Sequence, residues 1–147
     1  MDKYIIYTNM ELFLDKLLPQ TTNLANFSAI IKENIEDLNW VGFYLYNGEN
    51  LYLGPFQGKA AVTLIEIGKG VCGRAAEKRE TIVVSDVHKF PGHIACDCDS
   101  LSEIVIPIIK DNKLFGVLDI DSPIRDRFNQ ETKEILENLV KLLIDFL

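Results

Sequence analysis

"EIVIPIIKDNKLFGVLDID", residues 103–121, is the stretch that decides the fold. Its two halves are rich in Ile, Val and Leu, as extended strands of a sheet commonly are. Between them lie Asp111 and Asn112, residue types that tolerate the left-handed backbone of a tight turn. The stretch therefore predicts two antiparallel strands joined as a hairpin.

A second hairpin is predicted earlier in the chain. Residues 39–46, "NWVGFYLY", and 51–58, "LYLGPFQG", are rich in aromatic residues and are separated by the turn "NGEN". Further elements are predicted between the two hairpins: a strand at 63–67, a short helix at 71–80 and a strand at 81–84. Because a hairpin joins neighbouring strands antiparallel, we expect a mostly antiparallel sheet.

Helices are predicted at both ends of the chain. In residues 8–19, "TNMELFLDKLLP", apolar residues recur at helical spacing, with Asn9 as the N-cap and Pro19 after the last turn. A second helix is predicted from about Thr22 and a last one from about Asn129. Helices that flank hairpin-connected strands indicate an α+β domain with a mostly antiparallel central sheet.

The size and charge of the chain restrict its function class. At 147 residues it is expected to form one domain, residues 1–147. A net charge of −7 opposes binding to nucleic acid or to an anionic membrane, both of which favour clustered Lys and Arg. No apolar run approaches the roughly 20 residues of a membrane span, and the first residues do not resemble a signal peptide. The three unevenly spaced cysteines are typical of reduced thiols, so we expect a cytoplasmic protein.

A glycine-rich segment, "GKGVCG" at residues 68–73, follows a predicted strand and opens a predicted helix. It matches the dinucleotide-binding pattern G-x-G-x-x-G, but hairpins rather than successive strand–helix–strand units surround it, which disfavours that function. Cys72 lies in the first turn of the helix, where the backbone N–H groups favour a thiolate. A small buried residue without a chemical role is the alternative for Cys72.

Two further cysteines, Cys96 and Cys98, lie in the polar segment "GHIACDCDS", residues 92–100. A structural metal site with Cys72 and His93 is one alternative, but the paired C-x-x-C spacing of zinc sites is missing. Inert exposed thiols are another, because neighbouring acidic residues disfavour a thiolate. Redox chemistry is the third. It requires a nucleophilic thiolate and a second thiol within reach, and this chain can supply both.

The segment "GVLDIDS", residues 116–122, carries two acidic residues near the end of its strand. Asp119 and Asp121 share one strand face about 7 Å apart, while Leu118 and Ile120 occupy the other. Such a pair could share a proton or bind an ammonium group. A strand end that meets solvent is the alternative.

Six segments in the same order resemble the free methionine-(R)-sulfoxide reductases, small enzymes with a GAF fold: "NWVGFYLY", "LGPFQGK", "IGKGVCG", "DVHKFPGHIACD", "SEIVIPI" and "GVLDIDSP". The resemblance implies a GAF-like α+β fold and reduction of free L-methionine-(R)-sulfoxide to methionine, with a thioredoxin-type dithiol as the reductant. It also suggests a homodimer. We expect no cofactor and no metal.

The resemblance also implies roles for individual residues. It indicates Cys96 as the nucleophile that becomes a sulfenic acid and Cys72 as its partner thiol, and it leaves the order of attack between them open. The polar cluster around the sulfoxide and the amino group comprises Glu103, Asp119 and Asp121. The aromatic residues that line the pocket are Trp40 and Tyr44.

One position departs from the family pattern. The family carries a cysteine in a "GKxAC"-like segment, whereas this chain reads "GKAAV", with Val62 at that position. Cys72 is therefore the first expected resolving thiol, with Cys98 assisting it or relaying the disulfide outward. Impaired recycling would favour the alternative function, a GAF-type sensor that binds a small ligand or responds to oxidation without turnover.

The register of the hairpin over residues 103–121 decides whether the carboxyl groups can meet. A regular ladder places Glu103 opposite Ile120, on the face away from both aspartates. A shared pocket requires a bulge, an odd loop length, or Glu103 lying just before the strand. Pro107 within the strand is a sign of such an irregularity.

Overall fold

The predicted hairpin is present in the computed structural model of the chain, which describes residues 1–93 and 99–147. β5 (Ser102–Lys110) and β6 (Lys113–Ser122) pair antiparallel. They turn at Asp111 and Asn112, whose φ angles of 51° and 68° are the left-handed conformation that the turn requires. The prediction of this hairpin is confirmed.

In the described part of the chain, six strands form one antiparallel sheet in the order β3-β2-β1-β6-β5-β4. β1 (Trp40–Tyr46) and β2 (Asn50–Gln57) form the aromatic hairpin, and β1 also pairs with β6. The short strands β3 (Leu64–Glu66) and β4 (Ile82–Val84) are the two edges. The pairing of β1 with β6 therefore joins the two predicted hairpins into a single sheet.

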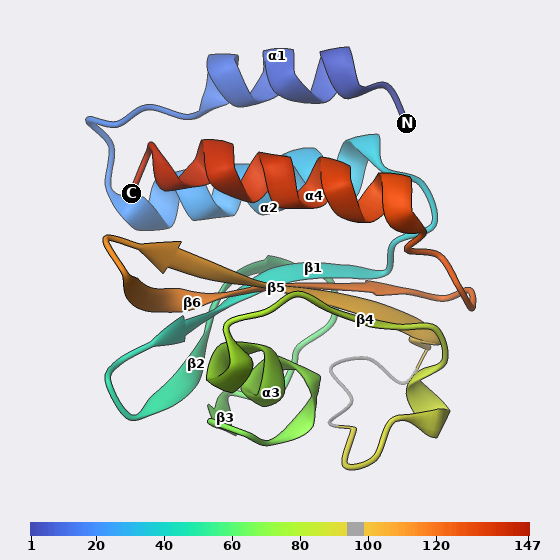
Figure 1. Cartoon of the computed structure of the whole chain (residues 1–147). Helices are drawn as coiled ribbons and strands as arrows, with labels where there is room; N and C mark the ends of the chain where they lie inside the picture. The colour runs from blue at the N-terminus through green and yellow to red at the C-terminus, as the bar shows by residue number, and fades with distance from the viewer. Residues whose placement is uncertain (94–98) are drawn as a thin grey trace.

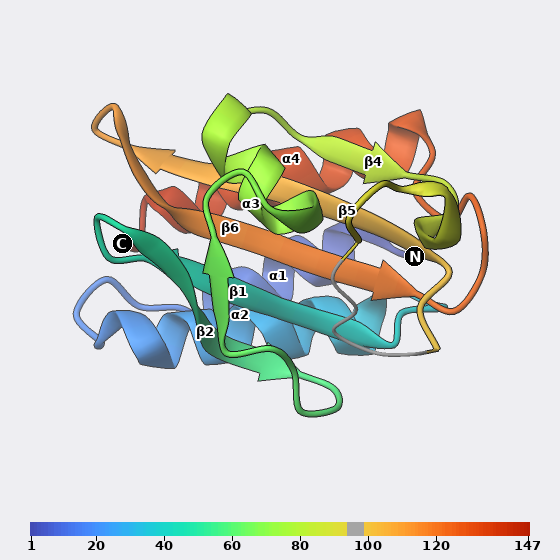
Figure 2. The same cartoon turned by 90° about the horizontal axis from the view of Figure 1, so that it is seen from below.

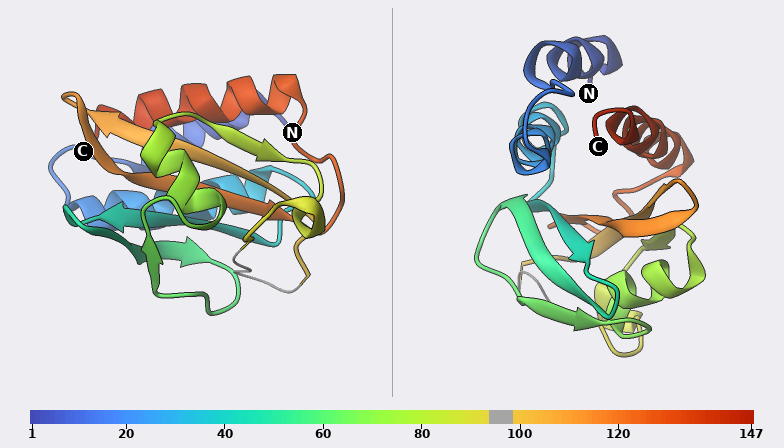
Figure 3. Two further views of the ribbon diagram at one scale, coloured as in Figure 1. Left: turned by 60° about the horizontal axis from the view of Figure 1, so that its bottom comes forward. Right: turned by 90° about the vertical axis from the view of Figure 1, so that its left-hand side faces the viewer.

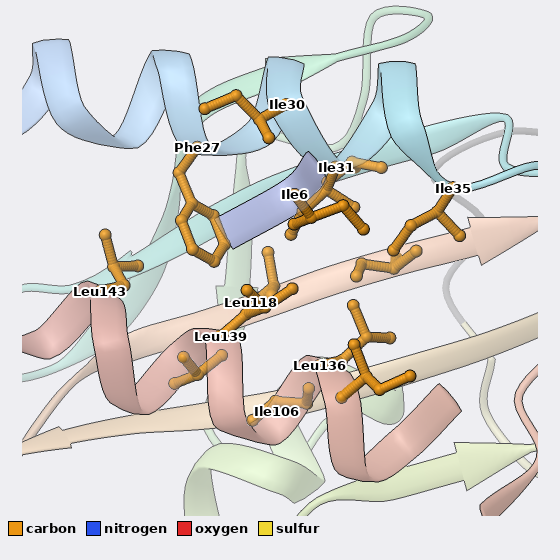
Figure 4. Close-up of a cluster of buried hydrophobic side chains, with 14 of the residues drawn as sticks. Ile6, Phe27, Ile30, Ile31, Ile35, Ile106, Leu118, Leu136, Leu139 and Leu143 are labelled. Atoms are coloured by element: carbon orange, nitrogen blue, oxygen red, sulfur yellow. The ribbon is translucent and has the colours of Figure 1, made fainter. Parts of the chain in front are cut away.

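The helices from both ends of the chain lie on one side of this sheet (Figures 1 and 3). α2 (Gln20–Asn34) and α4 (Gln130–Ile144) lie against the strands, and α1 (Lys3–Phe13) packs on α2 from the outside. Their apolar side chains form a core with one face of β1, β5 and β6, part of which is drawn in Figure 4. Fully buried members of this core include Ile6, Phe27, Ile31, Leu118 and Leu139. The predicted α+β class, with terminal helices flanking an antiparallel sheet, is confirmed.

The first helix starts earlier than predicted. It begins at Lys3, where the side chain of Asp2 accepts hydrogen bonds from two backbone N–H groups of the first turn. It ends at Phe13, so the prediction of a helix over residues 8–19 is wrong. Asn9 lies inside the helix because the carboxylate of Asp2 provides a cap two turns earlier.

The other two helix starts are close to their predictions. α2 begins at Gln20, directly after Pro19, and α4 begins directly after Asn129. The Asn129 side chain accepts a hydrogen bond from the backbone N–H of Thr132 and so caps α4. None of the helices in residues 1–93 and 99–147 has the length and apolar character that a membrane crossing requires.

The opposite face of the sheet, which we call the α3 face, carries α3 (Gly70–Lys78). This helix contacts β5 and β6 (Figure 2). A second apolar cluster lies between α3 and the strands and includes Trp40, Val105 and Val117. Because alternate residues of a strand point to opposite faces, every second residue of β1, β5 and β6 belongs to this side. The predicted site residues of these strands lie on the α3 face.

Candidate active site

A bulge in the β5–β6 ladder places the carboxyl groups of Glu103, Asp119 and Asp121 on the α3 face, and we call these three groups the carboxyl cluster. The register shifts directly after Ile108, where Phe115 of β6 is an extra residue without a partner in the ladder. Between the bulge and the open end of the hairpin, each β5 residue pairs with a β6 residue one position later than in a regular ladder. Glu103 therefore lies opposite Asp121 instead of Ile120. This bulge is the irregularity that a shared pocket requires, and it lies close to Pro107, the residue that indicated it.

β1 adds two aromatic side chains beside these carboxyl groups. In the β1–β6 ladder Trp40 lies opposite Asp121, and Gly42 lies opposite Asp119. The Trp40 ring packs against Gly42, where a Cβ atom would be only 2.6 Å from a ring carbon. Trp40 also stacks on Tyr44, with ring centroids 6.0 Å apart. Both predicted pocket aromatics are fully buried next to the carboxyl cluster.

The polar atoms of the two aromatic side chains hold the loop of residues 58–63, which we call the strap. Trp40 Nε1 donates a hydrogen bond to the carbonyl oxygen of Lys59 at 2.9 Å. The Tyr44 hydroxyl donates to the carbonyl oxygen of Val62 at 2.8 Å. The strap connects β2 to β3, and two side chains of β1 thus fasten it to the α3 face.

Cys72 lies in the first turn of α3, as predicted, and is buried. Its Sγ, a carboxylate oxygen of Glu103 and a carboxylate oxygen of Asp119 all lie within 4.8 Å of one another. The helix therefore delivers a thiol to the carboxyl cluster that the two strands form.

Burial sets the protonation state of the carboxyl cluster. Glu103, Asp119 and Asp121 are 2%, 0% and 2% exposed. Burial raises the pKa of Glu103 well above its usual value, the charge of Asp121 raises it further, and a hydrogen bond with Asp119 lowers it in part. Burial therefore favours the neutral acid form of Glu103. Since a metal ligand must be deprotonated, the cluster suits proton donation better than metal binding.

His93 extends the cluster toward the surface. Its Nε2 lies 3.3 Å from Oε1 of Glu103, and its side chain is 15% exposed. Burial lowers the pKa of His93, and the negative charge of Asp119 partly offsets this effect. The sequence pointed to His93 only as a metal ligand, so its contact with Glu103 was missed. The available signal was its place in the matched segment "DVHKFPGHIACD".

Packing accounts for the glycines of "GKGVCG". A Cβ atom on Gly73 would lie 2.4 Å from the carbonyl oxygen of Glu66, so the glycine allows α3 to approach the end of β3 closely. Gly70 has a φ of 62°, which is the left-handed conformation that glycine favours. The pattern that resembles a dinucleotide fingerprint thus has a structural explanation.

Cys96 and Cys98 lie outside the described residues, so their roles stay predictions. The described residues on both sides of them adjoin the site. On one side, His93 contacts the carboxyl cluster. On the other side, Asp99 Oδ2 forms an ion pair with Nζ of Lys59, a residue of the strap, at 2.8 Å.

Known proteins resemble this chain over most of its length. The GAF domain family matches residues 18–144. The free methionine-R-sulfoxide reductase of Escherichia coli (strain K12) is 44% identical over 147 residues, which cover 97% of this chain and 89% of the relative. The free methionine-R-sulfoxide reductase of Saccharomyces cerevisiae is 52% identical over 129 residues, which cover 82% of this chain and 72% of the relative.

Two solved structures of fRMsr of Staphylococcus aureus share the fold. The reduced form superposes with a TM-score of 0.93 at 48% identity, covering 99% of this chain and 94% of the other. The form in complex with substrate has a TM-score of 0.90 at 50% identity, covering 97% and 93%. The likeness therefore extends over nearly the whole chain.

Proposed function

This chain belongs to the free methionine-R-sulfoxide reductases of the GAF domain family, and on that premise we propose that it reduces free L-methionine-(R)-sulfoxide to methionine. One observation carries the proposal: Sγ of Cys72 lies within 4.8 Å of carboxylate oxygens of Glu103 and Asp119. This places a thiol that can resolve a sulfenic acid beside a carboxylic acid that can protonate the sulfoxide oxygen, and thiol-dependent reduction of a sulfoxide uses both groups.

The chemistry of the proposed pocket suits a free amino acid. We assign Trp40 and Tyr44 to the apolar part of the substrate, since both rings lie beside the carboxyl groups. Asp119 and Asp121 bind the α-ammonium group through charge-assisted hydrogen bonds. A methionine sulfoxide within a peptide lacks this ammonium group, so the carboxyl cluster selects the free amino acid.

The first proposed step transfers oxygen from the substrate to a cysteine. The Cys96 thiolate attacks the sulfoxide sulfur, and the carboxylic acid of Glu103 protonates the oxygen as negative charge develops on it. The sulfur–oxygen bond of the substrate breaks, the cysteine becomes a sulfenic acid, and methionine leaves. The substrate sulfur gains two electrons, and the cysteine sulfur loses two.

A second thiol then removes the oxygen from the enzyme. Cys72 condenses with the sulfenic acid, so that a disulfide forms and the oxygen leaves as water with the thiol proton. We assign this step to Cys72 because it already lies in the carboxyl cluster. A thioredoxin-type dithiol reduces the disulfide by exchange, and Cys98 assists this step or relays the disulfide outward.

Val62 bears on the recycling route. It packs in the same apolar cluster as Cys72, and its carbonyl oxygen accepts the hydrogen bond from Tyr44. A cysteine at this position would therefore lie near the proposed resolving thiol. With valine there, Cys72 and Cys98 are the two thiols that remain besides Cys96, since the chain has three cysteines.

We also propose that the protein is a cytoplasmic homodimer. Its three cysteines, one of them in the carboxyl cluster, need a reducing compartment to act as thiols. Large apolar side chains on α1 and just after it are exposed, among them Tyr4, Leu12 and Leu17 at 81%, 70% and 92%. In a homodimer these side chains would be covered by the partner, since contiguous exposed apolar surface is typical of contacts between proteins. Sedimentation velocity over a range of protein concentrations tests the dimer, and a monomer throughout would contradict it.

The activity is tested with three substrates. Purified protein is incubated with the free R epimer, the free S epimer and a peptide-bound methionine sulfoxide, each with thioredoxin or with dithiothreitol as reductant. We expect turnover of the free R epimer alone. Absence of turnover with both reductants would contradict the proposal, and binding of the free R epimer without turnover would support the sensor alternative.

A further inference from the structure

The buried carboxyl cluster must recover a proton in every reaction cycle. In the proposed reaction, on which this inference rests, Glu103 gives its proton to the sulfoxide oxygen and is left as a carboxylate. Glu103 is 2% exposed, and neither Asp119 nor Asp121 is more exposed than that. Since these groups are buried, a residue that contacts both the cluster and the solvent provides a route by which the proton can return.

His93 meets both requirements. Its Nε2 lies 3.3 Å from Oε1 of Glu103, and its side chain is 15% exposed whereas that of Glu103 is 3% exposed. The two residues before it, Pro91 and Gly92, are exposed. We propose that His93 returns the proton from solvent to Glu103, as a positioning residue that acts through Glu103 and not on the substrate.

The charge of Glu103 sets the direction of this transfer. While Glu103 is a neutral acid, partial burial lowers the pKa of His93 and so favours its neutral imidazole. Once Glu103 is a carboxylate, its negative charge 3.3 Å away stabilises the imidazolium, and His93 takes a proton from water. The proton then moves from Nε2 to Oε1, and both groups are neutral again. Only N–H and O–H bonds form and break, and no electrons are transferred.

The carboxyl groups of β6 favour this exchange. The negative charge of Asp119 raises the proton affinity of His93. Asp121, which lies opposite Glu103, raises the proton affinity of Glu103. The charge of Asp119 therefore attracts a proton to His93, and the charge of Asp121 attracts a proton to Glu103.

The groups of α3 act on the same region from the other side. Cys72 lies within 4.8 Å of Glu103 and shares its buried surroundings. The guanidinium of Arg74 stacks on Phe90, 4.8 Å from the ring centroid, in the loop that leads to His93. A side chain of α3 therefore packs against the loop that carries His93.

The first experiment replaces each of the two histidines of the chain in the full-length protein. His88 is exposed on the short helix η1 (Val87–Lys89), so His88→Gln is the matched control for His93→Gln. We expect His93→Gln to lower kcat for the free R epimer on the order of 100-fold, with a changed pH–rate profile and a nearly unchanged KM. We expect His88→Gln to keep the kcat and the profile of the wild type.

Rescue by a small molecule separates proton transfer from structural support. His93→Gly leaves space for imidazole added to the buffer, which we expect to restore kcat in proportion to its concentration. Unchanged kcat and pH profile in His93→Gln would overturn the inference. A folded His93→Gly variant that imidazole does not restore would also overturn it, since only a structural role would then remain.

An NMR titration tests the coupling without turnover. The ring resonances of His93 are followed across pH in the wild type and in Glu103→Gln. We expect the wild-type ring to respond to ionisation of Glu103 and the variant to lack this response. Identical titration curves would overturn the inference even in an active reductase. Coupled titration in a protein that does not turn over would contradict the proposed function alone.

Discussion

Glu103 of β5 lies directly opposite Asp121 of β6, and this pairing depends on Phe115, the extra residue of the bulge. In a regular ladder Glu103 would lie opposite Ile120, whose side chain belongs to the core under α2 and α4. A displacement of one residue thus moves a carboxyl group from an apolar core into a polar cluster. The catalytic role proposed for Glu103 depends on this displacement.

We predict that Glu103→Gln lowers kcat for the free R epimer by about 100-fold or more. The amide keeps the size of the side chain but cannot give a proton to the sulfoxide oxygen. Steady-state kinetics measures the effect, and Glu66→Gln on the exposed end of β3 is the matched control. A wild-type kcat in Glu103→Gln would remove Glu103 from the mechanism.

We predict that the wild-type protein loses stability as pH rises above the ordinary pKa of glutamate. Because burial raises the pKa of Glu103 in the folded state, the folded chain keeps a proton that the unfolded chain has released. The free energy of unfolding then falls by about 1.4 kcal/mol for each pH unit between the two pKa values and is level above the folded-state pKa. Denaturant unfolding at several pH values measures this fall, and Glu103→Gln should reduce it. Equal slopes in both proteins would contradict the prediction.

We predict that Tyr44→Phe destabilises the protein by about 1–2 kcal/mol and raises KM. The change removes the buried hydroxyl that donates to the carbonyl oxygen of Val62, and so releases one end of the strap. Tyr46→Phe is the matched control on the same strand, because its hydroxyl donates to Gly48 in an exposed turn. Equal effects of the two substitutions on unfolding and on KM would argue against a role for the strap in the pocket.

We predict that Cys72→Ser performs the first half of the reaction but does not recycle. Methionine should appear as a single burst equivalent to the enzyme present, because oxygen transfer needs Cys96 and resolution needs Cys72. Rapid-quench measurement of methionine distinguishes this burst from continued turnover. Cys98→Ser is the companion variant: full thioredoxin-linked turnover in it would remove Cys98 from the relay.

We predict that Val62→Cys increases the rate of turnover with thioredoxin as the reductant and leaves KM unchanged. The new thiol would lie in the apolar cluster that contains Cys72, while the bond from Tyr44 uses the backbone of residue 62. Val62→Ala is the control for a change of side chain without a thiol. A rate equal to that of Val62→Ala would show that a thiol at this position does not contribute.

Local patterns predicted the parts of the fold that depend on neighbours in the sequence. The turn at Asp111 and Asn112 was predictable because both residue types tolerate a positive φ. The cap of α4 at Asn129 was predictable for a similar reason, since its side chain bonds to its own first turn. For α1 the apolar spacing indicated a helix, but its start was not predicted because Asp2, and not Asn9, is the N-cap.

The parts of the site that depend on pairing across the sheet were not predictable in detail. Pro107 signalled an irregularity on β5, whereas the extra residue, Phe115, lies on β6. The contact between His93 and Glu103 joins two segments that no local pattern relates. The resemblance to a family supplied the members of the carboxyl cluster, and the ladder register explains how they meet.

The hydrogen bond from Tyr44 to the main chain of residue 62 makes the position of the strap independent of the side chain that residue 62 carries. Any amino acid offers the same carbonyl oxygen, so the side chain there can be exchanged while the pocket keeps its form. A cysteine at this position can therefore be replaced by valine during evolution, while another cysteine forms the disulfide. Substrate recognition and electron supply can then evolve independently.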